Sequence, residues 1–308
     1  MDRYPQSSTV DFHNKADGHE RRIALYLVEN MQYTFKPFEQ YIYCTQLMQA
    51  ECHANAYRFW RRQWKGPGRE YCAGALVWQM NDCWPVTSWA IVDYHLRPKH
   101  AYFAIKRELA PITIGVKRTV HSTPADRYTR AYIKLVYKIE VWASNFTLQR
   151  RSVDVQLKAW DVVSGKEIYS GIIHRGLVLE PNRTVEISDF EIPIGKGKDE
   201  DDVSRVVVAA YLIEEGKQVA RYVNWPEPLK YTHLQKPKRL EVRVCSDAGR
   251  VEISVEVPVK GVALESEDDA VVFLDNCVDI VPGETVSIGA KGLRKGEDDK
   301  ISVRYLGL

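Results

Sequence analysis

The chain has 308 residues, 27% charged side chains and a formal net charge of +2, which is ordinary for a globular protein of two or three domains. A net charge this small excludes the strong positive field of a dedicated nucleic-acid-binding protein, so we expect no nucleic-acid partner. No apolar run reaches the length of a membrane span, and we expect no membrane partner.

The first 110 residues are predicted to form helices around one buried strand. A short helix is expected at 19–31, and a longer one at 38–64, where apolar side chains recur close to the 3.6-residue period and Gly66-Pro67-Gly68 follows. The apolar run at 73–77 predicts a strand over 72–80, and a further helix is expected at 98–109. This is a β/α pattern, but a complete (β/α)₈ barrel needs about 250 residues.

After Pro111 the pattern changes to alternating apolar and polar residues. Such segments, separated by turns, are typical of antiparallel β-sandwiches. The stretches Trp225-Pro226-Glu227-Pro228 and Lys236-Pro237-Lys238 suggest a boundary near 230–238, and a charged loop is expected at 195–202. The predicted fold is therefore α/β plus all-β: residues 1–110 as the last β/α units of a TIM barrel, then two immunoglobulin-like β-sandwiches at 111–235 and 236–308. The first set of strands is predicted at 133–141, 153–159, 168–177 and 203–213, and the second at 240–244, 251–257, 270–274, 285–288 and 301–305.

The stretch Trp78-Gln79-Met80-Asn81-Asp82-Cys83-Trp84-Pro85 follows the predicted strand directly. Indole rings stack on the C–H face of a pyranose, and amide and carboxylate groups hydrogen-bond sugar hydroxyls. We therefore take Trp78, Asn81, Asp82 and Trp84 as candidate substrate-binding residues. The competing interpretation is that Asn81 and Asp82 hold the loop and that Trp84 packs it onto the rest of the domain.

This stretch and its continuation through Trp89, Asp93 and Arg97-Pro98-Lys99-His100 resemble the last barrel strand and following helix of glycoside hydrolase family 2, in particular β-mannosidases of the fungal intracellular type. The resemblance implies that Trp78 forms the floor under the terminal sugar, with Asn81, Asp82 and Trp84 beside it. It also implies retaining hydrolysis of terminal non-reducing β-D-mannose residues, with β-mannoside oligosaccharides as substrates.

No catalytic residue can be carried over from that family. Its acid/base follows Asn in an Asn-Glu pair and its nucleophile lies in a Ser-Glu-Phe/Tyr-Gly context. This sequence has no Asn-Glu pair, and its one Ser-Glu, Ser266-Glu267, is followed by Asp-Asp. We expect the remaining glutamates of the first third to be solvated (Glu39, Glu51, Glu70 and Glu108). The chain is therefore expected to be a fragment that lacks both catalytic glutamates and is inactive alone.

Several alternatives stay open. The chain could belong to another family 2 exo-β-glycosidase, such as an exo-glucosaminidase or a galactosidase, or it could be a noncatalytic carbohydrate-binding or scaffold remnant. His13 and His19 could suggest a metal site, but with no further ligands apparent we predict no metal and no cofactor. The six cysteines show no metal spacing, and the first residues show no signal-peptide pattern, so a cytoplasmic protein is expected. The oligomeric state stays open.

Overall fold

The computed structural model describes residues 2–124, 133–191, 203–294 and 300–307. Its first third is helical, with α1 at Ser8–Phe12, α2 at His19–Asn30, α3 at Phe38–Arg62 and α4 at His100–Glu108. α3 buries Tyr43, Leu47, Ala50 and Ala54, whose spacing follows one face of a helix. Within the described residues no helix combines the length and the apolar character that a membrane span requires.

A first β-sandwich follows the helices. One sheet has the strand order β1-β2-β5 and the other β4-β3-β6-β7, with antiparallel neighbours. Along β3 the side chains of Val153, Val155, Leu157 and Ala159 are buried, which confirms the predicted two-residue alternation. They meet apolar residues of the facing sheet in a single core. The strands are β1 (Ile112–Pro124), β2 (Ile133–Asn145), β3 (Arg151–Asp161), β4 (Glu167–Leu179), β5 (Arg183–Glu191), β6 (Val206–Glu214) and β7 (Lys217–Asn224).

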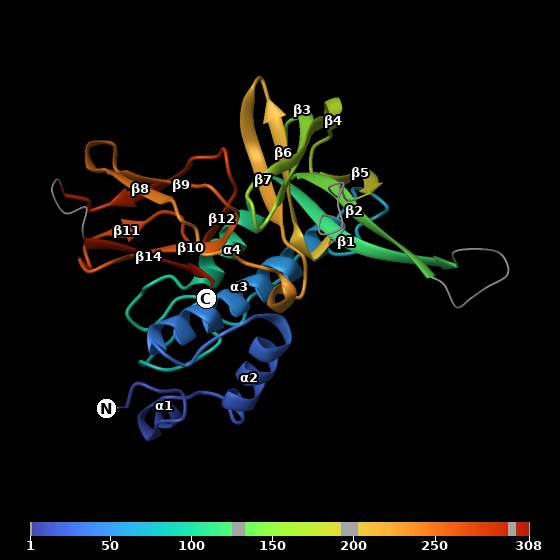
Figure 1. The fold of residues 1–308 in the computed structure, drawn as a ribbon. Coiled ribbons are helices and arrows are strands. Elements are labelled where there is room, and N and C mark those ends of the chain that lie inside the picture. Colours follow the sequence, from blue (N-terminus) through green and yellow to red (C-terminus); the bar gives the residue numbers. More distant parts are fainter. Residues whose placement is uncertain (1, 125–132, 192–202, 295–299, 308) are drawn as a thin grey trace.

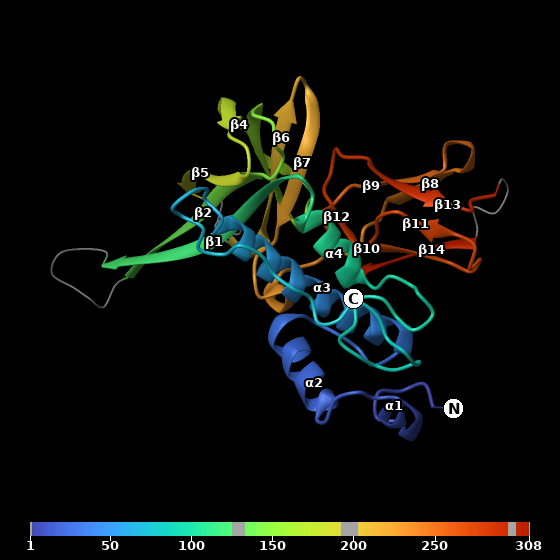
Figure 2. The ribbon, with the colours of Figure 1, turned by 180° about the vertical axis from the view of Figure 1, so that it is seen from behind.

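A second, smaller sandwich completes the chain. Its sheets have the strand orders β12-β10-β14 and β11-β13-β9-β8, and they enclose a core that includes Ile253, Val262 and Ile288. The two sandwiches lie side by side above α3 (Figures 1 and 2). The strands are β8 (Leu240–Cys245), β9 (Arg250–Val255), β10 (Val259–Ser266), β11 (Val272–Phe273), β12 (Val278–Ile280), β13 (Val286–Lys291) and β14 (Ile301–Leu306), and 3₁₀ turns lie at η1 (Val203–Arg205), η2 (Leu229–Tyr231) and η3 (Ser246–Ala248).

The long helix α3 shares one apolar core with both sandwiches. Leu47 of α3 belongs to the same buried cluster as Trp160 and Tyr211 of the first sandwich and Ala263 of the second. The Tyr43 hydroxyl donates a hydrogen bond of 2.6 Å to the Gly261 carbonyl oxygen. A Cβ atom at position 261 would lie 2.6 Å from that same hydroxyl, and Gly261 has a φ of +65°, so this close approach requires glycine.

A network of charges around the buried Lys260 lies where the three units meet. On β12, the Asp279 carboxylate accepts hydrogen bonds from Lys260 Nζ at 3.0 Å, the Gly261 N–H at 2.9 Å and Trp225 Nε1 at 2.9 Å. Lys260 Nζ also donates to Glu51 of α3 at 2.6 Å. Burial disfavours the Lys260 ammonium, but Asp279 and Glu51 outweigh that effect and raise its pKa above the usual value. The network therefore joins α3, the end of β7 and the second sandwich.

Two expectations for the first third are wrong. The segment 72–80 forms no strand, because it has no neighbouring strand to pair with among the described residues. Glu51 and Glu108 are not simply solvated: Glu51 binds Lys260, and Glu108 accepts a hydrogen bond of 2.9 Å from Arg58 Nε. The charged loop expected at 195–202 lies outside the described residues. The strands β1, β5, β7, β10 and β12 were not singled out in the sequence.

We predict that Asp279→Ala destabilises the chain strongly. Removing one partner of a buried ion pair costs about 3–5 kcal/mol, because the other charge stays buried without compensation. Here Lys260, the Gly261 N–H and the Trp225 indole would all lose an acceptor. The free energy of unfolding in urea measures the effect. The matched control is Asp247→Ala in the exposed η3 turn, expected within about 0.5 kcal/mol of the parent. Equal losses in the two variants would contradict the prediction.

Candidate functional site

The candidate residues begin on an extended segment with one covered and one open face. Leu76, Trp78 and Met80 are exposed to 99%, 76% and 54%. Ala75 and Val77, on the alternate positions, pack against the core that α3 and α4 share. The segment therefore keeps the two-residue periodicity of a strand without the hydrogen bonds of one, and it directs the Trp78 indole outward.

The backbone after Trp78 is held by the segment 89–92. The Ile91 and Val92 N–H groups donate to the carbonyl oxygens of Gln79 and Met80 at 3.2 and 2.9 Å. The Trp89 indole N–H donates to Gln79 Oε1 at 3.3 Å. The peptide bond between Trp78 and Gln79 is cis. The hydrogen bonds fix the backbone directly after the exposed Trp78 side chain.

Asp82 is buried and bonded on both oxygens. Only 3% of the residue is exposed. Its Oδ1 accepts a hydrogen bond of 3.2 Å from Lys15 Nζ, and its Oδ2 accepts one of 2.6 Å from the Ser88 hydroxyl. Nearby, burial lowers the pKa of Lys99, against an opposing effect of Asp82. Through these two hydrogen bonds, Asp82 connects its own segment with the segments of Lys15 and Ser88.

Asn81 and Trp84 lie on either side of this anchor. Asn81 is exposed, and its side-chain amide donates a hydrogen bond of 3.4 Å to the Asp82 carbonyl oxygen. Trp84 is half-buried, and its ring stacks on His13 with 5.3 Å between centroids. The exposed Trp78 indole, the exposed Asn81 amide and the half-buried Trp84 indole thus lie close together in sequence.

The segment 13–15 also contacts the candidate residues, although the sequence does not predict it as part of the site. His13 Nδ1 lies 2.7 Å from the Pro85 carbonyl oxygen, and the Thr87 N–H donates to the His13 carbonyl oxygen at 2.7 Å. Lys15 reaches Asp82 and lies 5.4 Å from the centroid of the Trp89 ring. No local pattern in the sequence predicts these contacts.

The arrangement carries the chemical groups that one wall of a sugar site would need. An exposed indole can stack on a pyranose, and the Asn81 amide can both donate to and accept from hydroxyls. Hydrolysis with retention requires two carboxyl groups about 5–5.5 Å apart. The carboxylate within this wall, Asp82, is already bonded to Lys15 and Ser88, so its chemistry here is that of an anchor.

Comparison with known protein families matches both sandwiches. Residues 137–231 match the family described as "Mannosidase Ig/CBM-like domain", and residues 234–306 match the one described as "Ig-fold domain". These matches agree with the two sandwiches observed in the structure and with the expected immunoglobulin-like class.

Curated relatives match the whole chain. The chain is 62% identical over 308 residues to a protein named "Beta-mannosidase B" from Thermothelomyces thermophilus, and 44% identical over 309 aligned positions to the protein of that name from Aspergillus niger. All of this chain is covered in the first case and 99% in the second, but only 36% and 35% of the relatives. The chain therefore spans about a third of the length of these relatives.

Solved structures share the fold. A β-D-mannosidase from Dictyoglomus thermophilum superposes with a TM-score of 0.74 at 22% identity, over 100% of this chain and 34% of that one. An exo-chitosanase from Amycolatopsis orientalis gives a TM-score of 0.63 at 17% identity, over 98% of this chain and 38% of that one. At identities of 22% and 17%, these comparisons show a shared fold and nothing further.

We predict that Asp82→Ala loosens the site locally. The variant removes the acceptor shared by Lys15 and Ser88 and leaves a lysine that is largely covered without its counter-ion, so the loop loses its internal tie. Hydrogen–deuterium exchange over residues 79–92 should become faster, while exchange over β3 and β6 stays unchanged. Asp17→Ala, an exposed carboxylate in the preceding turn, is the control and should leave both regions unaltered. Unchanged exchange in Asp82→Ala would show that the loop is held without this side chain.

Proposed function

We propose that the chain belongs to the β-mannosidases of glycoside hydrolase family 2, as a C-terminal part of such an enzyme. The whole enzyme hydrolyses terminal non-reducing β-D-mannose residues of β-mannosides with retention, through a mannosyl-enzyme intermediate. This chain contributes one wall of the sugar site and the two sandwiches that support it.

The observation that carries this proposal is the two-faced segment 75–80. Its covered positions, Ala75 and Val77, pack on helices, while Leu76, Trp78 and Met80 are open. A barrel strand has this arrangement, with one face toward the outer helices and the other toward the barrel interior. We therefore propose that residues 1–110 form the last β/α units of a TIM barrel, followed by domains at 111–235 and 236–308.

Within that barrel the four candidate residues take different roles. Trp78 forms the floor beneath the terminal mannose, and the exposed Asn81 amide hydrogen-bonds its hydroxyls. Trp84, backed by His13, forms an edge of the site. Asp82 belongs to the site as the buried anchor that fixes Asn81 and Trp84, since both of its oxygens are already bonded within the chain.

The catalytic pair comes from outside this chain. Neither of the family's glutamate contexts occurs in the 308 residues, so we assign no catalytic residue here. The high identity to proteins named β-mannosidase B supports a mannoside over another exo-glycosidase substrate. The proposed partners are therefore β-mannoside oligosaccharides. The absence of nucleic-acid and membrane partners, and the cytoplasmic location, stay predictions.

We predict that the purified 308-residue chain does not hydrolyse a chromogenic β-mannoside above background. A general acid and a nucleophile together supply most of the rate enhancement of a retaining glycosidase, and a binding wall cannot replace them. Release of the chromophore is the measurement. The control is the same chain fused behind the upstream two-thirds of the Thermothelomyces relative, which should be active. Turnover by the chain alone, with host enzymes excluded, would refute the assignment of the catalytic pair to the missing part.

We also predict that Trp78→Ala in the fused enzyme lowers kcat/KM by roughly tenfold or more. Loss of a stacking indole removes about 1–3 kcal/mol of binding to the sugar, by analogy with burial of a large apolar side chain. Tyr231→Ala, which removes an exposed aromatic ring from the η2 turn, is the matched control and should leave kcat/KM unchanged. Kinetics and melting temperature are measured together. An unchanged kcat/KM with a large drop in melting temperature would show that Trp78 is a packing residue.

A further inference from the structure

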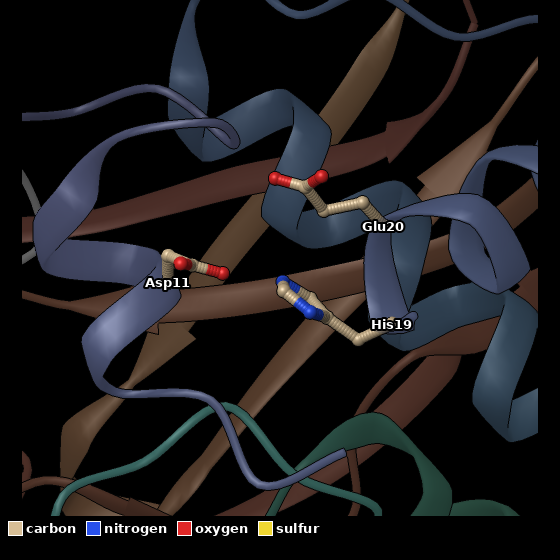
Figure 3. A group of neighbouring side chains, drawn as sticks. All are labelled: Asp11, His19 and Glu20. Atoms are coloured by element: carbon tan, nitrogen blue, oxygen red, sulfur yellow. The ribbon is translucent and has the colours of Figure 1, made fainter. Parts of the chain in front are cut away.

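Three ionisable side chains from the segments that flank His13 in the sequence converge in the structure. Asp11 lies in α1, and His19 and Glu20 begin α2. The carboxylate oxygens of Asp11 and Glu20 and a ring nitrogen of His19 all lie within 4.8 Å of one another. Figure 3 shows the imidazole directed at the space between the two carboxylates.

One ring nitrogen of His19, at the centre of this group, has no hydrogen-bond partner among the described residues. This atom, Nε2, has no solvent exposure, while Asp11 and Glu20 are exposed. A buried ring nitrogen without a partner is unfavourable unless something binds it. Neither carboxylate forms an ion pair within the described part of the chain, so two negative charges lie beside it without a counter-ion.

The local fold keeps these groups together. The Ser7 hydroxyl caps α1 by accepting a hydrogen bond of 3.1 Å from the Val10 N–H, which sets the position of Asp11. Gly18 precedes α2 with a φ of +67°, a left-handed conformation that suits glycine and turns the chain back toward α1. The two helix ends therefore face each other across the turn 13–18.

We propose that Asp11, His19 and Glu20 form a binding site for a divalent transition-metal ion, with Zn²⁺ as the best match. Zn²⁺ takes imidazole nitrogen and carboxylate oxygen ligands at about 2.0–2.2 Å in a tetrahedral arrangement, which places ligand atoms about 3.3–3.6 Å apart. The ligand atoms lie within 4.8 Å of one another here, and rotation of the two exposed carboxylate side chains would close the remaining gap. Three protein ligands leave room for water in the remaining position.

The ion also balances the local charge. A neutral imidazole and two carboxylates carry a net charge of −2, which a divalent ion cancels. In the sequence, His13 and His19 have no further ligands apparent near them. The structure instead engages His13 with Trp84 and Pro85 and brings Asp11 and Glu20 to His19. Bound at these residues, the ion links α1 to α2 and fixes the turn that supports His13 behind Trp84.

Titration of the full 308-residue chain with Zn²⁺ tests the site by calorimetry. We expect saturable binding of one ion per chain. Since loss even of an outer-shell partner weakens metal binding by about 10–100-fold, His19→Ala should weaken it at least about tenfold. Asp11→Asn and Glu20→Gln keep the side-chain shape and should weaken it as well. His174→Ala, an exposed histidine on β4, is the matched control and should bind like the parent. Circular dichroism of each variant verifies that it folds.

A second measurement reports the link between the helices. Zn²⁺ should slow tryptic cleavage after Lys15 in the parent and in His174→Ala, and should not slow it in His19→Ala. Parent-like affinity in His19→Ala, an equal loss in His174→Ala, or no saturable binding by the folded parent would each overturn the proposal. Mg²⁺ should bind more weakly than Zn²⁺, because imidazole favours the transition metal. Equal affinity for both ions would show that His19 is not a ligand and would contradict the proposal.

Discussion

The carboxylate of Asp279 is the constraint on which the arrangement of this molecule depends. It satisfies Lys260, the Gly261 backbone and the Trp225 indole at once, while Lys260 reaches Glu51 on α3. A buried lysine is tolerated only when it is paired. The Asp279 carbonyl oxygen also accepts two hydrogen bonds of 3.0 Å from Arg221 of β7. The second sandwich, the first sandwich and α3 are therefore held at one point, and apolar packing around Leu47 and Tyr211 surrounds it.

This junction fixes α3, and α3 in turn fixes the site. The far end of α3 buries Ala54 and Tyr57 against α4, and Ala75, Val77 and Ile91 pack on the same core. The extended segment that carries Trp78 has no ladder of strand hydrogen bonds, so its position comes from that packing and from the contacts with residues 89–92. Because the helices are close-packed, they transmit the order of the sandwiches to the loop.

Around the wall, polar groups have divided roles. Asp82 is bonded on both oxygens and holds the loop, whereas Asn81 stays exposed. His13 lies behind Trp84, and the proposed ion site at Asp11, His19 and Glu20 would stabilise the turn that positions it. The residues that we propose to contact a sugar are thus backed by residues from an earlier segment of the chain. That order of support is expected where binding geometry must be held closely.

The sequence by itself determined the helices α2, α3 and α4, most strands of both sandwiches and the candidate wall, because helical and two-residue periodicities and the Trp78–Pro85 motif are local. Only the tertiary structure decided what those residues touch. Glu51 and Glu108 look like solvated helix residues, yet their partners, Lys260 and Arg58, come from distant or buried positions. Segment 72–80 has the composition of a strand, but a strand needs neighbours, and none pairs with it in the described residues. Asp82 was equally compatible with binding sugar or holding the loop, and its contacts with Lys15 and Ser88 depend on chain segments that meet only after folding.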